Sequence, residues 1–151
     1  AHDFGQVVDI NLKGATHCAL SVLPAMRAQR DGVIVVVSSW AGHEFLSFTG
    51  AAYNASKAGL TMLARTINHE EGRHGIRANS VLVGVIDAGM FHELMAKGAF
   101  PPTWVEETQK MLSVKRWGQP EEIGYAVSWL ASARAAYVTG QQINVSGGFG
   151  L

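Results

Sequence analysis

The order of elements that the sequence predicts indicates an α/β fold built on a parallel sheet. Helical segments and short apolar runs alternate in the order helix–strand–helix–strand–helix–strand. Such alternation is typical of parallel strands joined by right-handed crossovers. The first apolar run, residues 33–37, reads Val-Ile-Val-Val-Val. An unbroken β-branched run of this kind is typical of a strand covered on both faces.

The first half of the chain predicts two helices and two strands. Apolar residues recur every three or four positions over 3–29, which favours a helix there. A strand is expected at 33–37 and a loop at 38–50. An Ala- and Leu-rich helix follows at 51–72 and a second strand at 76–83.

The second half is less regular. Residues 84–117 are expected to be irregular, with a short helix at 103–112. A proline and two acidic residues open a helix at 120–133, where both types favour the first turn. The last strand is predicted at 141–145. Three strands are few for such a sheet, so one edge of the strand at 33–39 is expected to need a further partner.

Composition excludes several classes of protein. The chain has 151 residues, enough for one domain, with 48% hydrophobic and 16% charged residues. Twelve basic and twelve acidic side chains balance, which argues against an electrostatic binder of nucleic acid or membrane surfaces. The apolar runs are too short to span a membrane. A lone cysteine, Cys18, is expected in the core, and its isolation fits a reducing, cytoplasmic location.

The start of the chain shows neither a signal peptide nor an initiator methionine. The chain is therefore expected to begin inside a longer one.

Three side chains form the most informative chemical pattern. Tyr53 and Lys57 are four residues apart on a predicted helix, so they share one face. Ser39 follows the first predicted strand, and open α/β sheets bind ligands at the carboxyl ends of their strands. An ammonium near a phenol lowers its pKa from about 10. Such a tyrosine exchanges a proton with an alcohol or carbonyl oxygen, which a nearby serine hydroxyl can hydrogen-bond.

The chain resembles the C-terminal part of a classical short-chain dehydrogenase/reductase along its whole length. The matching segments occur in order: residues 8–14 (Val-Asp-Ile-Asn-Leu-Lys-Gly), 36–39 (Val-Val-Ser-Ser) followed by Gly42, 53–59 (Tyr-Asn-Ala-Ser-Lys-Ala-Gly), 75–79, 116–123 and 139–148. The resemblance implies a doubly wound, Rossmann-type parallel sheet. It implies that the N-terminal half of that single domain is missing from residues 1–151.

The resemblance also implies an activity, namely hydride transfer between NAD or NADP and an alcohol or carbonyl substrate. Tyr53 would be the general acid/base, and Lys57 would lower its pKa and bind the nicotinamide ribose. Ser39 would polarise the substrate oxygen, and Asn11 would hold a water in the proton relay.

The chain departs from the family pattern in three places, one of which is a spacing from Ser39 to Tyr53 that is one residue longer than is common. It has no Gly-rich loop opening a helix after a first strand, so we expect the chain alone to bind a dinucleotide poorly. After the second strand, the usual proline and threonine are replaced by Val83 and Ala88. Gly84 and Ile86 still match, and the backbone of Ile86 is expected to bond the nicotinamide carboxamide.

Side chains near these motifs are candidates for the substrate pocket. Trp40 and His43 follow the serine motif, and Met90 and Phe91 belong to an apolar, Met-rich segment that the family uses to cover substrate. No metal site is expected, because the His-rich segment 69–74 lacks the spacing of a zinc helix.

Two functional hypotheses remain open. The first is an NAD(P)-dependent oxidoreductase seen as its catalytic portion. The second is a non-catalytic remnant that acts only through oligomer contacts. In either case the two long helices resemble those of the family's homodimer and homotetramer interfaces, and no nucleic acid or membrane partner is expected.

Overall fold

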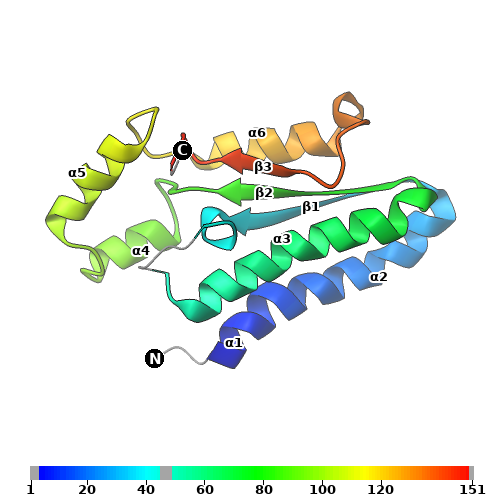
Figure 1. Cartoon of the computed structure of the whole chain (residues 1–151), viewed down its shortest axis with the longest axis horizontal. Helices are drawn as coiled ribbons and strands as arrows, with labels where there is room; N and C mark the ends of the chain where they lie inside the picture. The colour runs from blue at the N-terminus through cyan, green and yellow to red at the C-terminus, as the bar shows by residue number, and fades with distance from the viewer. Residues whose placement is uncertain (1–3, 45–48, 150–151) are drawn as a thin grey trace.

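The computed structural model describes residues 4–44 and 49–149, and its centre is a three-stranded parallel sheet (Figure 1). The strands are β1 (Gly32–Ser39), β2 (Ile76–Val83) and β3 (Gln142–Val145), in the order β1-β2-β3. Pairing of β1 with β2 runs from Gly32 opposite Ile76 to Ser39 opposite Val83. The predicted parallel α/β arrangement is confirmed.

One face of the sheet is covered by the N-terminal helices (Figure 1). α1 (Phe4–Val8) passes through a π-helical turn, η1 (Asp9–Lys13), into α2 (Gly14–Gln29). α3 (Ala51–Glu71) connects β1 to β2. The helix predicted over 3–29 is thus present with a π-helical interruption, and its first residue lies outside the described part of the chain.

The opposite face is covered by α6 (Pro120–Ala131) (Figure 1). At the start of this helix the Glu122 carboxylate accepts a hydrogen bond from the Gln119 N–H at 2.8 Å, and the Glu122 N–H donates to the Gln119 carbonyl at 3.0 Å. Two short helices, α4 (Met90–Ala96) and α5 (Pro102–Met111), lie beyond the carboxyl ends of the strands. The sequence predicted α5 but not α4.

The core is divided between the helical layer and the carboxyl end of the sheet. Ala19, Leu23, Ile67, Ile76 and Ala78 are buried between α2, α3 and the sheet. A second cluster joins β2 to the segment around α4 and α5, and it consists of Trp40, Leu82, Leu112, Trp117 and Phe149. The second cluster fixes the short helices over the carboxyl end of the strands.

Two details differ from the sequence-based expectation. β1 extends through Ser38 and Ser39, which were expected in the following loop. Cys18 was expected in the core but is exposed on α2. No helix in the described part of the chain is both long and apolar enough to cross a membrane.

Candidate active site

The predicted catalytic residues gather at the carboxyl end of β1. Figure 1 shows this end of the sheet beside the start of α3, the turn η2 (Trp40–Gly42) and α4. In open α/β sheets the carboxyl ends of the strands are where ligands bind. The fold therefore places Ser39, Tyr53 and Lys57 where such a site is expected.

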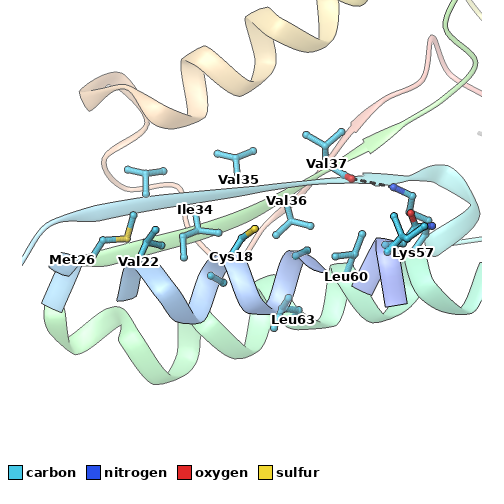
Figure 2. Close-up of a pocket in the computed structure, with 15 residues that line it drawn as sticks. Cys18, Val22, Met26, Ile34, Val35, Val36, Val37, Lys57, Leu60 and Leu63 are labelled. Carbon is cyan, nitrogen blue, oxygen red and sulfur yellow. Dashed lines mark hydrogen bonds between the residues drawn. The ribbon is translucent and has the colours of Figure 1, made fainter. Parts of the chain in front are cut away.

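Tyr53 and Lys57 lie one turn apart on α3. The Lys57 Nζ atom is 5.6 Å from the centre of the Tyr53 ring. It also donates a hydrogen bond to the backbone carbonyl of Val37, at 3.3 Å (Figure 2). Burial lowers the pKa of Lys57 below its usual value, because the charged ammonium loses hydration. The lysine is thus partly desolvated and held close to the phenol ring.

Two hydroxyl groups, one at the end of β1 and one on α3, hydrogen-bond the backbone of Lys57. Its carbonyl oxygen accepts hydrogen bonds from Ser38 Oγ at 2.8 Å and from Thr61 Oγ1 at 3.1 Å, and both hydroxyls are buried. Thr61 Oγ1 also lies 3.1 Å from Ser38 Oγ. A Cβ atom on Gly42 would stand 2.6 Å from the same carbonyl, so glycine permits this close approach. These contacts fix the start of α3 against the end of the strand.

Ser39 ends β1 and caps the turn that follows. Its Oγ atom accepts a hydrogen bond from the backbone N–H of Ala41 at 3.2 Å. This bond orients the hydroxyl of a half-buried side chain at the carboxyl end of the sheet.

Asn11 reaches the site from the π-helical turn η1. Its Nδ2 atom donates to Ser56 Oγ at 3.1 Å, and Ser56 Oγ donates to the carbonyl of Tyr53 at 2.8 Å. Ser56 is fully buried. Single π-helical turns inside α-helices are frequent at functional sites. The sequence reasoning missed Ser56, although a small polar residue three positions after Tyr53, on its buried side, was a usable signal.

Gly84 and Ile86 follow β2 at the same end of the sheet. The Gly84 N–H donates to Val145 O at 3.1 Å, and a Cβ atom there would stand 2.7 Å from the Cα of Ser146. Ile86 forms an isolated parallel bridge with Gly118. The bonds of this bridge are made by Val85 and Asp87, so the N–H of Ile86 points away from Gly118 and takes no part in the pairing.

The four predicted substrate-lining residues occupy different environments. Trp40 is 5% exposed and belongs to the core cluster, and Phe91 packs on that cluster with its ring 5.3 Å from Trp117. His43 and Met90 are exposed. The structure thus divides these four residues into two that anchor the region and two that solvent reaches. In residues 4–44 and 49–149, no group of three His, Cys, Asp or Glu side chains could hold a metal ion.

Comparison with known proteins gives the same family throughout. The sequence matches the family described as Enoyl-(Acyl carrier protein) reductase over residues 1–150. It is 36% identical over 147 residues to the 3-oxoacyl-(acyl-carrier-protein) reductase of Thermotoga maritima, and 35% identical over 147 residues to that of Staphylococcus epidermidis. Each match covers 97% of this chain, but only 56% and 57% of the relative.

Solved structures show the same partial correspondence. A 3-oxoacyl-(acyl-carrier protein) reductase from Brucella melitensis superposes with a TM-score of 0.89 at 30% identity, covering 98% of this chain and 53% of that one. A Brucella melitensis reductase with bound NAD superposes with a TM-score of 0.86 at 30% identity, covering 98% and 52%. The chain therefore spans about half the length of these relatives and matches their C-terminal halves. It belongs to the short-chain dehydrogenase/reductase family, of which it represents the C-terminal portion of a Rossmann-type fold.

Proposed function

We propose that this chain carries the catalytic portion of a nicotinamide-dependent oxidoreductase that transfers hydride between its cofactor and an alcohol or carbonyl substrate. The observation that carries the proposal is the Lys57 ammonium held 5.6 Å from the Tyr53 ring, beside the strand end that bears Ser39. The proposal is supported by the family to which the chain belongs and by its similarity to proteins that are named as reductases.

Each residue has a distinct part in the proposed proton transfer. The Tyr53 hydroxyl gives a proton to the substrate oxygen in reduction and takes it back in oxidation. The Lys57 ammonium favours the phenolate form electrostatically. The Ser39 hydroxyl hydrogen-bonds the substrate oxygen as charge develops on it. Asn11 holds a water in the relay and, through Ser56, positions the backbone of Tyr53.

The cofactor in this proposal is NAD or NADP, which supplies or accepts the hydride when it is bound. The donors at the site fit the nicotinamide end of such a molecule. Lys57 has three N–H groups, one of which bonds Val37, so others are available to ribose hydroxyls. The Ile86 N–H, directed away from Gly118, suits the carboxamide oxygen. A relative with bound NAD supports this assignment.

The proposed substrate is a small alcohol or carbonyl compound with an apolar body. Aromatic rings dominate the segment beyond the carboxyl end of the sheet, where Phe100 stacks on Trp104 with ring centres 4.1 Å apart. Phe91 and Trp117 continue this cluster. An apolar cover of this kind excludes water from the reacting atoms.

Replacement of Tyr53 tests the proposal. In a fusion that places the unmatched part of the Thermotoga maritima reductase ahead of this chain, Tyr53→Phe is expected to lower kcat for carbonyl reduction by about 10²–10⁴-fold, the usual contribution of general acid catalysis. The melting temperature should change little, because only a hydroxyl is removed. Tyr125→Phe is the matched control, since Tyr125 is 72% exposed on α6. Full activity in the Tyr53 variant would refute the proposed proton donor.

Exposed apolar side chains favour a second candidate, a non-catalytic chain that acts through homodimer or homotetramer contacts. Leu20 on α2 and Met62 on α3 are 58% and 57% exposed. Fluorescence titration with NADH and NADPH, together with sedimentation velocity, separates the two candidates. Oligomers of the fusion that bind neither nucleotide would favour the second.

A further inference from the structure

Two buried hydroxyl groups lie between β1 and α3, next to the candidate active site. They belong to Ser38 on the strand and Thr61 on the helix, which are 3% and 5% exposed. Ser38 Oγ, Thr61 Oγ1 and the carbonyl oxygen of Lys57 lie 2.8 to 3.1 Å from one another. The two hydroxyls therefore meet at the backbone of the residue that carries the candidate ammonium group.

The helix alone does not account for this arrangement. Lys57 lies inside α3, where a carbonyl oxygen already accepts the N–H of the residue four positions later. A threonine hydroxyl commonly bonds the carbonyl four residues before it, which explains the bond from Thr61. The bond from Ser38 comes from another element, so its effect is to join α3 to β1.

The same lysine is held by β1 at both of its ends. Its Nζ atom donates to the carbonyl of Val37 (Figure 2), and its carbonyl accepts from the hydroxyl of Ser38, the next residue of the strand. Ser39, whose hydroxyl is proposed to bond the substrate oxygen, follows directly. Tyr53 must reach the same oxygen from α3, so the position of α3 against β1 decides whether the two hydroxyls can act together.

Apolar packing between the two elements cannot fix that position by itself. Further along the helix, the contact with β1 consists of Val36, Leu60 and Ala64. Apolar contacts are non-directional, whereas hydrogen bonds have preferred distances and angles. The polar contacts around Lys57 are therefore the ones that define how the strand and the helix are aligned.

We propose that Ser38 and Thr61 are positioning residues of the candidate active site. Their hydroxyl groups hold the backbone of Lys57 against β1. The lysine ammonium and the Tyr53 hydroxyl are thereby placed relative to Ser39. This inference rests on the proposed function, and it adds two residues that act through Lys57 without contact with the reacting atoms.

The titration of Lys57 tests the positioning without any reaction. Burial lowers the pKa of Lys57, so this pKa reports whether the ammonium stays at the end of β1. We measure it by NMR on the chain with ¹³C-labelled lysine side chains, and identify the signal by its loss in Lys57→Arg. Ser38→Ala and Thr61→Val should raise the pKa toward its usual value, because the ammonium gains hydration. Thr61→Ser keeps the hydroxyl and should keep the pKa of the parent.

Turnover in the fusion with the Thermotoga maritima portion provides the second arm. A misplacement of 1 Å can cost about 10²-fold in rate, and a contact that is only loosened should cost Ser38→Ala about tenfold in kcat. KM for the substrate should change little, because the Ser38 hydroxyl does not bind it.

Ser80→Ala is the matched control for both arms. Ser80 is a 0% exposed serine on the neighbouring strand β2, and its hydroxyl donates to the carbonyl of Gln141 at 3.5 Å. Its loss removes a buried hydroxyl from the same sheet without touching Lys57, so kcat and the pKa of Lys57 should stay at the parent values. Circular dichroism checks folding, and Thr61→Val replaces Ser38→Ala in both arms if Ser38→Ala unfolds.

The outcomes separate positioning from general stability and from the reaction itself. An unchanged kcat together with an unchanged pKa of Lys57 in Ser38→Ala would overturn the proposal. Equal losses of kcat in Ser38→Ala and Ser80→Ala would also overturn it, because the Ser38 hydroxyl would then act only through stability. A raised pKa of Lys57 in Ser38→Ala, with no turnover in the parent fusion, would support the positioning and refute the proposed reaction.

Discussion

β1 and β2 differ both in sequence and in environment, because residues 33–37 of β1 are an unbroken β-branched run whereas β2 includes Arg77, Asn79 and Ser80. β2 lies between β1 and β3, with α3 on one face and α6 on the other, and Ile76, Ala78, Val81 and Leu82 are at most 2% exposed. β1 has one strand neighbour in the described residues, and its Val37 is 47% exposed. Of the two, only the β-branched run of β1 predicts a strand covered on both faces. Burial in this molecule is therefore decided by what packs around a strand.

The two strands also differ in how they treat polar side chains. β2 buries Asn79 completely, and its amide bonds the backbone of the segment entering β3. β1 buries Ser38, which bonds the backbone of Lys57 in α3. The buried amide of β2 holds the segment that leads into β3, whereas the buried hydroxyl of β1 joins the sheet to the helix that carries Tyr53 and Lys57.

The largest expected effect comes from placing the same charge in both strands. Val81→Asp puts an unpaired carboxylate at a position that is 0% exposed, and should lower the free energy of unfolding by more than about 4 kcal/mol. Val37→Asp should lower it by about 1 kcal/mol or less, because solvent already reaches that side chain. Urea denaturation followed by circular dichroism measures both. Equal losses would mean that the difference in burial between the strands has no energetic consequence.

A smaller effect is expected from the buried amide of β2. Asn79 Nδ2 donates to Val138 O at 2.9 Å, and its Oδ1 accepts from Gln141 N–H at 3.0 Å. Asn79→Ala leaves these two backbone groups without their partner, which should cost about 2–3 kcal/mol of unfolding free energy. Asn144→Ala is the control, since Asn144 is exposed in β3, and its loss should stay below about 0.5 kcal/mol. An unchanged free energy of unfolding in Asn79→Ala would contradict the proposed role of the amide in holding β3.

Much of this fold could be predicted from the sequence, because its elements are marked locally. Proline and acids at 120–122 mark the start of α6, and β-branched runs mark the strands. α4 was not predicted, since its seven residues are too few for a clear helical period and its stability depends on packing of Phe91 against Trp117. The exposure of Cys18 was predicted wrongly, because periodicity identifies an apolar face but not whether anything covers it.

The candidate site likewise has contacts that local spacing predicts and contacts that it does not. The four-residue spacing of Tyr53 and Lys57 placed both on one side of α3, because it is close to the helical period of 3.6 residues. The link from Asn11 through Ser56 could not be derived this way, because it joins residues 45 positions apart through a π-helical turn. The roles of these residues in catalysis stay predictions that the Tyr53→Phe experiment tests.

The smallest expected effect concerns α6, the helix that covers β2 and leaves part of β1 open. Its Glu122 forms two hydrogen bonds with the Arg116 guanidinium, at 2.7 and 2.8 Å, and accepts another from the Gln119 N–H. These bonds lower the pKa of Glu122 from 4.5 to about 2, and the bonds to Arg116 have the largest effect.

A carboxylate whose pKa falls on folding stabilises the protein above its unfolded pKa, and this stabilisation is lost as the pH falls through the folded pKa. Glu122→Gln should therefore be less stable than the parent at pH 7, with a difference that shrinks between pH 4.5 and pH 2 and is absent below that. Urea denaturation at pH 7, 4 and 2.5 measures the trend. Glu121→Gln, which removes a charge from the same turn and leaves the Arg116 pair intact, is the control. A difference that is constant with pH would show that Glu122 stabilises the start of α6 by packing and not through its charge.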